Sequence, residues 1–137
     1  MCYFLYGAIN ENINKTEYER VINKSKFYFN FGNKDAVNMA VRKTDDKFRI
    51  TDDYCDCDTP FGSKKTKHHD LTEFSELLKN LKRVPDISYI YVSKNWWEET
   101  NTEEETVHID DINPITYFSN IKDNCLYRIK FGYGNKY

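Results

Sequence analysis

The fold class is decided by residues 70–81, which read DLTEFSELLKNL in one-letter code. The stretch begins with a capping box, because the side chains of Asp70 and Glu73 can each accept a hydrogen bond from the other's backbone N–H. Its leucines and Phe74 recur at helical spacing, so one face of the helix is apolar. Pro85 follows, as is typical beyond a helix C-terminus. The stretch therefore predicts an amphipathic helix that packs on another layer of the protein.

The segments around this helix predict a sheet. Residues 87–97 (ISYIYVSKNWW) are rich in β-branched and aromatic side chains, which is typical of a strand. Further strands are expected over 2–9, 26–31, 36–42, 47–51, 106–109 and 125–131, and further helices over 14–25 and 113–120. The order β-α-β-β-β-α-β-β-α-β predicts an α+β fold, with a single mostly antiparallel sheet and helices packed on one face. We expect 106–109 to form a hairpin with 87–97, joined by an acidic loop over 98–105.

Length and charge limit the classes of protein to consider. A chain of 137 residues is near the commonest size for one domain, so we expect 1–137 to be a single α+β domain. The net charge of -2 argues against general attraction to nucleic acids or anionic membranes. No apolar run approaches the roughly 18 residues that span a bilayer. We therefore expect a cytoplasmic protein with no membrane association, whose four cysteines are reduced thiols or metal ligands.

The chemically richest segment is 54–58 (YCDCD), where two thiols lie one residue apart. Zinc takes four nitrogen or sulfur ligands in a tetrahedron. The candidate metal ligands are Cys55, Cys57, His68 and His69, with Cys2 or Cys125 as a further thiol. The alternative is that the cysteines lie half-buried in a turn, the histidines are exposed, and the protein has no cofactor. The spacing favours this alternative, because a second short cysteine pair is absent from the sequence.

A cysteine nucleophile is the second kind of chemistry that the sequence suggests. Met1-Cys2 before an apolar strand resembles the opening of class II glutamine amidotransferases, although Tyr3 replaces the glycine that typically follows the cysteine. The resemblance implies that Met1 is removed and that Cys2, then the N-terminal residue, uses its own α-amine as the base for its thiol. The other possible arrangement has Cys55 or Cys57 as the nucleophile, His68 or His69 as the base and an Asp that orients the base. A cysteine at the start of a buried strand is more often an ordinary core residue.

Protein recognition is the third possibility. Trp96 and Trp97 lead into the acidic stretch 98–105, which ends in Glu103, Glu104 and Glu105. Rigid aromatic anchors beside steering charges are typical of protein-binding surfaces. Such a surface would prefer a partner with a basic surface, and an edge strand near 87–91 could also pair two copies as a homodimer. The alternative is a core-facing tryptophan at the end of a strand and a solvated hairpin tip.

These considerations leave two functional hypotheses. The first is a small protein-binding module, an inhibitor or regulator of a macromolecular partner, such as a bacterial or phage defence-related factor. It rests on the size, the acidity and the aromatic and acidic side chains around 96–105. The second is a thiol- or zinc-dependent protein, such as a hydrolase, built on Cys55, Cys57, His68 or His69, and Cys2. Whether the protein is an enzyme stays open at this point.

Overall fold

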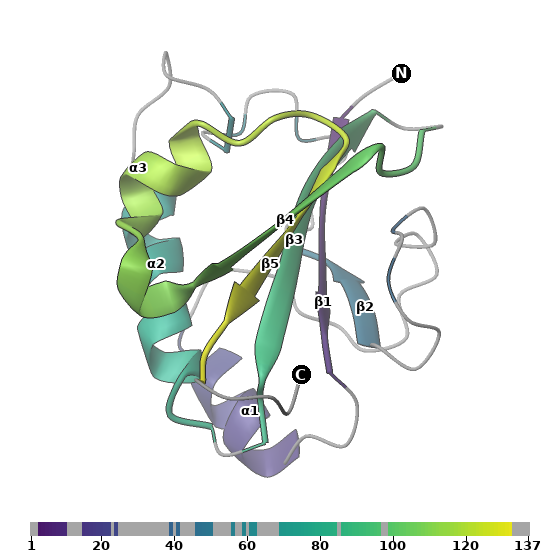
Figure 1. Cartoon of the computed structure of the whole chain (residues 1–137). Helices are drawn as coiled ribbons and strands as arrows, with labels where there is room; N and C mark the ends of the chain where they lie inside the picture. Colours follow the sequence, from purple (N-terminus) through teal and green to yellow (C-terminus); the bar gives the residue numbers. More distant parts are fainter. Residues whose placement is uncertain are drawn as a thin grey trace.

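The structure is a computed structural model, and it describes residues 3–10, 15–22, 24, 39, 41, 46–50, 56, 59, 61–62, 69–84, 86–96 and 99–132. Its elements in chain order are β1 (Tyr3–Ile9), α1 (Lys15–Ile22), β2 (Asp46–Arg49), α2 (His69–Leu81), β3 (Tyr89–Trp96), β4 (Glu103–His108), the short 3-10 helix η2 (Ile109–Asp111), α3 (Pro114–Ser119) and β5 (Cys125–Lys130). Figure 1 shows the strands side by side with the helices next to them. The predicted α+β class is confirmed.

The strands form one five-stranded sheet in the order β2-β1-β3-β5-β4. β1 pairs antiparallel with both β2 and β3, and β3 pairs antiparallel with β5. β4 pairs with β5 in the parallel direction. The sheet is therefore mixed rather than mostly antiparallel, and the predicted strand order was wrong.

The predicted hairpin between 87–97 and 106–109 does not form. β5 lies between β3 and β4, because the chain leaves β4 through η2 and α3 before it returns (Figure 1). β4 also begins at Glu103, so the three glutamates expected in a loop are strand residues. A parallel pair joins segments separated by a crossover, and Glu is depleted in strands. Neither the alternation of apolar and polar residues nor the strand propensity of the glutamates could therefore indicate that β4 pairs in parallel with β5.

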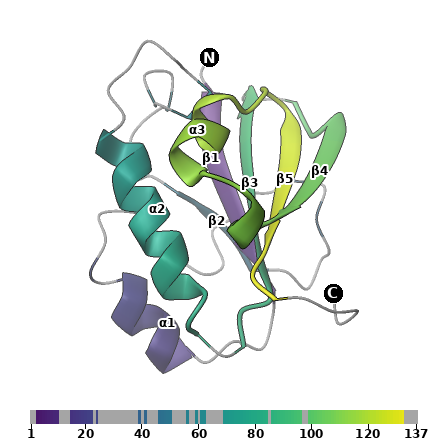
Figure 2. The ribbon, with the colours of Figure 1, turned by 60° about the vertical axis from the view of Figure 1, so that its left-hand side comes forward.

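The three helices lie on one face of the sheet, as predicted (Figure 2). Helix α2 buries the apolar stripe expected of it, and the Phe74 ring packs edge-on against Phe61 at 5.0 Å and against Phe118 of α3 at 5.2 Å. α3 begins as predicted too, because the Asn113 side chain accepts hydrogen bonds from two backbone N–H groups of its first turn. None of the described helices is long and apolar enough to cross a membrane.

The opposite face of the sheet carries a second apolar cluster. Its buried members are Tyr6, Ala8, Met39, Tyr89, Tyr91 and Leu126. Met39 and Val41 are the only described residues of the predicted strand 36–42, and both lie in bends; the predicted strand 26–31 lies outside the described residues. β3 is paired on both sides, so the edge strand expected near 87–91 for a homodimer was wrong.

The close approach of β1 and β2 depends on a glycine. A Cβ atom added at Gly7 would lie 2.4 Å from Cε2 of Phe48 and 3.2 Å from Cγ1 of Ile50. Both of those side chains are fully buried, so they have little room to move away. Glycine is therefore needed at position 7, because the Phe48 ring occupies the space that a side chain there would fill.

Replacing Gly7 should destabilise the protein through this contact. We expect Gly7→Ala to lower the free energy of unfolding by about 1–3 kcal/mol, because overpacking forces buried side chains off their rotamers. In Gly7→Ala/Phe48→Leu the smaller side chain admits the methyl group, so the double variant should lose less than the sum of the single variants. Urea denaturation of all four proteins measures this coupling. Strict additivity would contradict the proposed contact.

Candidate functional site

Two of the predicted binding residues lie at the same corner of the sheet. Trp96 is the last residue of β3 and Glu103 is the first of β4, and the two strands are not neighbours. Asn124, in the turn before β5, joins them. Its side-chain oxygen accepts a hydrogen bond from the Trp96 N–H at 3.0 Å, and its backbone oxygen accepts one from the Thr102 N–H at 2.8 Å. Figure 1 shows these three chain segments meeting at the upper right.

Asn124 holds this corner with both its backbone and its side chain. Its φ of 60° is left-handed, a conformation that Asn tolerates better than most residues other than Gly. In this conformation its N–H donates to the Lys94 carbonyl at 2.8 Å, and its side-chain nitrogen donates to the Glu99 carboxylate. Asn124 was not among the predicted site residues, although an Asn directly before a strand is a signal of such a turn. It is a positioning residue for the segment that includes Trp96 and Glu103.

Trp96 itself is only partly exposed. Its ring packs edge-on against the Tyr3 ring, with centroids 4.8 Å apart. Two further aromatic residues of β3, Tyr89 and Tyr91, are buried in the cluster on the opposite face of the sheet. The exposed aromatic surface of this corner is therefore small, and Trp96 is the candidate anchor within the described part of the chain.

The glutamates Glu103, Glu104 and Glu105 are all exposed on β4, at the edge of the sheet. Side chains alternate between the two faces of a strand, so the middle glutamate points away from the other two. Glu103 lies 3.6 Å from Lys122, and both side chains are mostly in solvent, so this ion pair contributes little stability. The edge therefore presents negative charge on both faces of the sheet.

Glu105 is oriented by a tyrosine of α3. The Tyr117 hydroxyl donates a hydrogen bond to Glu105 at 3.0 Å. Burial, together with this carboxylate, raises the pKa of Tyr117 above its usual range, so the hydroxyl stays protonated as the donor. Burial also raises the pKa of neighbouring Tyr127 to about 12. The Tyr117 hydroxyl thus links the acidic strand to the helical layer.

The segment 54–58 contributes a buried carboxylate. Asp56 is 2% exposed and accepts hydrogen bonds from the Leu5 N–H at 2.7 Å and from Arg49 at 2.9 Å. Its own N–H donates to the Tyr3 carbonyl at 2.9 Å. Asp56 therefore supplies hydrogen-bond partners to the backbone of β1 at Tyr3 and Leu5, beyond the part of β1 that pairs with β2. This structural role was not foreseen from the sequence, because an Asp between two cysteines suggests a metal or a turn.

The predicted thiol and histidine site falls mostly outside the described residues. Cys2, Cys55, Cys57, His68 and Trp97 all lie there, and His69 opens α2 but its side chain is not described. Cys125 is buried on β5, and burial raises the pKa of its thiol, which makes it a poor nucleophile. Three strand spacings separate β5 from Asp56, about 14 Å at ~4.8 Å per strand. Among the residues that the structure does describe, there is no group of side chains able to hold a metal ion.

Comparisons of the chain with models of protein families, with curated proteins and with solved structures found no match.

The left-handed turn at Asn124 gives a test of how the corner is held. Asn124→Ala removes both side-chain hydrogen bonds and places a Cβ-bearing residue at positive φ without a compensating contact, so we expect a loss of about 2–3 kcal/mol in the free energy of unfolding. Asn124→Gly keeps the backbone conformation accessible and should lose only about 1 kcal/mol. Urea denaturation measures both. A glycine variant no more stable than the alanine variant would contradict this assignment.

Proposed function

We propose that the protein is a small protein-binding module whose contact surface is the acidic edge strand β4. The observation that carries the proposal is the exposure of Glu103, Glu104 and Glu105 on a strand that pairs only with β5 among the described strands. The outer side of an edge strand presents backbone N–H and C=O groups with which another chain can pair. A module of this kind acts by occupying a surface of a macromolecular partner, as an inhibitor or regulator does.

The charge on β4 selects the partner. Carboxylates along an edge steer a basic surface toward it and disfavour an acidic one. Two copies of β4 placed edge to edge would bring six carboxylates close together, and this like-charge repulsion disfavours the strand pair. The preferred partner is therefore another protein with a basic extended segment, rather than a second copy of this chain joined through β4.

Trp96 lies two strands in from β4, and its ring packs toward Tyr3 of β1, so it would contact only a partner that also covers this corner of the sheet. A partly exposed tryptophan supplies apolar contact area at low cost in side-chain entropy. Asn124 accepts hydrogen bonds from the Trp96 N–H and from the N–H of the residue before Glu103, so the backbone at the end of β3 is held next to the beginning of β4. Trp97, the second expected anchor, stays a prediction.

A basic extended peptide is a direct probe of this proposal. We expect a short peptide with alternating lysine and threonine to shift the amide NMR signals of 103–108 in a saturable and salt-sensitive way. The triple variant Glu103→Gln/Glu104→Gln/Glu105→Gln should weaken this binding by at least about tenfold, because opposite charges across a strand pair each contribute a few tenths to 1 kcal/mol and long-range steering adds to them.

The matched control removes the same charge elsewhere. Glu19→Gln/Glu76→Gln/Asp86→Gln changes three acidic residues that are exposed and lie outside β4, and the affinity for the peptide should stay within about twofold of the unaltered protein. Equal weakening in both triple variants would mean that only the net charge matters. Shifts spread over all acidic surfaces would lead to the same conclusion, and β4 would not be the site.

A thiol-dependent zinc protein is the second candidate, and one contact favours it. Asp56 donates its N–H to the Tyr3 carbonyl, and these two residues are the sequence neighbours of Cys55 and Cys57 and of Cys2. Zinc held by cysteines stabilises small folds strongly. In this candidate the ligands would be Cys2, Cys55 and Cys57 with His68 or His69.

Elemental analysis separates this candidate from the first. If zinc is bound through these thiols, protein purified without chelator should contain one zinc per chain, and Cys55→Ser or Cys57→Ser should abolish it. Cys125→Ala is the control and should keep the metal, because Cys125 lies on β5 with its thiol in the core. Metal-free protein with an unchanged melting temperature after chelation would exclude the zinc hypothesis and leave the binding-module proposal untouched.

A further inference from the structure

The edge strand β4 has two chemically different halves. The first half, 103–105, consists of three exposed glutamates. The second half, 106–108, carries no carboxylate: Thr106 is exposed, Val107 is partly buried against the core and His108 is buried. Figure 1 shows β4 running from the upper right corner of the sheet to the short helix η2, where the chain leaves the sheet. The chemistry of the edge therefore changes along its length.

The charges around the start of β4 add to the acidity of its first half. Glu99 is exposed, and its carboxylate accepts a hydrogen bond from the Asn124 side chain. Asp123, the residue before Asn124, is a further exposed carboxylate. Lys122 is an exposed cation of the same connection and lies 3.6 Å from Glu103. Among the described residues of this corner, five exposed carboxylates thus accompany one exposed lysine.

The charges beside the second half have the opposite sign. The parallel register places Arg128 next to Thr106 and Lys130 next to His108, both on β5. The Arg128 guanidinium lies 4.6 Å from the ring centroid of Tyr89, which is on the other side of β5, so Arg128 acts on the edge through its charge rather than by contact. The carboxylates of η2 follow only after the chain has left the sheet. A basic segment therefore gains more from the first half of β4 than from the second.

This charge gradient determines which part of a bound segment lies where. Opposite charges directly across a strand pair attract each other, and like charges repel. A segment whose lysines are confined to one half therefore binds best with that half opposite 103–105. Val107 presents some apolar surface, which a β-branched side chain directly opposite would cover. The matching segment thus has one basic half and one apolar half.

Hydrogen bonding selects the direction of the added segment. β4 pairs in parallel with β5, but this pairing does not dictate the direction of a strand added at the free side. Antiparallel pairs are slightly more stable per residue than parallel pairs. In the antiparallel direction, the C-terminal half of the added segment lies opposite 103–105 and its N-terminal half lies opposite 106–108.

We propose, on the basis of the binding edge proposed above, that β4 receives an antiparallel extended segment of another protein in which β-branched apolar residues are followed by basic residues. The basic residues pair with the glutamates of 103–105, and an apolar side chain covers Val107. The order of apolar and basic residues along the partner is then as important as its net charge.

Two peptides of reversed sequence test this order. The first reads threonine-valine-threonine-lysine-lysine-lysine, and the second has the same residues in the opposite order; both are acetylated and amidated, so their net charges are equal. We expect NMR titration at low ionic strength, followed on the amides of 103–108, to show the first peptide binding about tenfold more tightly. Three lysines opposite three glutamates account for a difference of this size.

A spin label on the N-terminus of the first peptide reports the direction itself. In the antiparallel arrangement the label lies next to 107–108, and Glu103 is about 14–17 Å farther along the strand at ~3.4 Å per residue. The amide signal of Val107 should therefore broaden much more than that of Glu103. The parallel arrangement predicts the reverse pattern.

A rearranged variant tests the gradient at constant charge. Glu103→Thr/Thr106→Glu moves one carboxylate from the first half of β4 to the second, and both positions are exposed. We expect the preference for the first peptide to fall to about threefold or less, because each peptide then faces carboxylates in both halves. An unchanged amide spectrum outside β4 and the segments next to it checks that the variant is folded.

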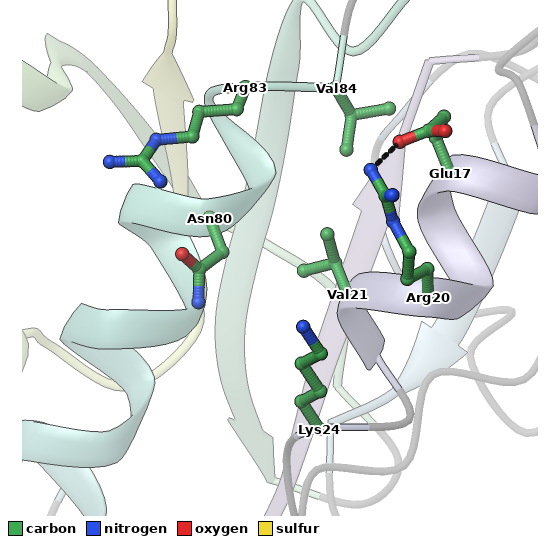
Figure 3. A pocket seen from close by; sticks show the side chains of 7 residues that line it. All are labelled: Glu17, Arg20, Val21, Lys24, Asn80, Arg83 and Val84. Atoms are coloured by element: carbon green, nitrogen blue, oxygen red, sulfur yellow. Dashed lines mark hydrogen bonds and ion pairs between the residues drawn. The ribbon is translucent and has the colours of Figure 1, made fainter.

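The pocket of about 180 Å³ between α1 and the end of α2 is an internal control within the same spectra (Figure 3). Arg20, Lys24 and Arg83 are among its lining residues, so a lysine-rich peptide is repelled there and should leave the signals of 80–84 unshifted.

Equal affinity of the two peptides, or stronger broadening at Glu103, would overturn the proposed order and direction while β4 remained the binding edge. An unchanged preference in the rearranged variant would also overturn it. Shifts at 80–84 as large as those at 103–108 would show attraction without a defined site, and absence of any shift at 103–108 with either peptide would overturn the binding edge itself.

Discussion

Parallel pairing between β4 and β5 requires the chain to leave the sheet after His108, cross the helical face and return at Cys125. η2 and α3 make this crossover. The ring of Phe118 in α3 packs against the ring of Phe74 in α2. The same route places β5 between β3 and β4, so β4 becomes the edge of the sheet. The exposure of the acidic strand and the position of α3 above it follow from this one pairing.

Two local contacts keep the ends of this sheet in place. Asn124 joins the end of β3 to the beginning of β4 across β5, at the corner where Trp96 and Glu103 lie. On the other side, Asp56 takes over from β2 as the partner of β1, with its carboxylate bound to Arg49 and to the Leu5 N–H. A buried ion pair of this kind is costly to break from one side, because it leaves an uncompensated charge. Both residues are polar and short, and both replace ladder hydrogen bonds that a strand would otherwise supply.

The sequence was sufficient for elements whose signals are local. The stripe of leucines in α2 and the Asn113-Pro114 start of α3 predict their helices directly, because spacing and capping act within a few residues. It was not sufficient for β4, whose glutamates have low strand propensity and whose partner lies beyond a helix. Of the candidate site, Glu103–Glu105 were found from charge alone, while Asn124 and Asp56 were missed because their roles arise only from contacts distant in sequence.

The most direct test of the account is the environment of the β4 backbone in solution. Because a parallel edge strand bonds through alternate residues only, every second amide of 103–108 should be protected from hydrogen exchange and the others should exchange rapidly. Backbone NOEs should connect Glu105 with Tyr127 and Val107 with Ile129, in accordance with the parallel register. NOEs from β4 to β3, or protection of every β4 amide, would contradict an open acidic edge and with it the proposed binding surface.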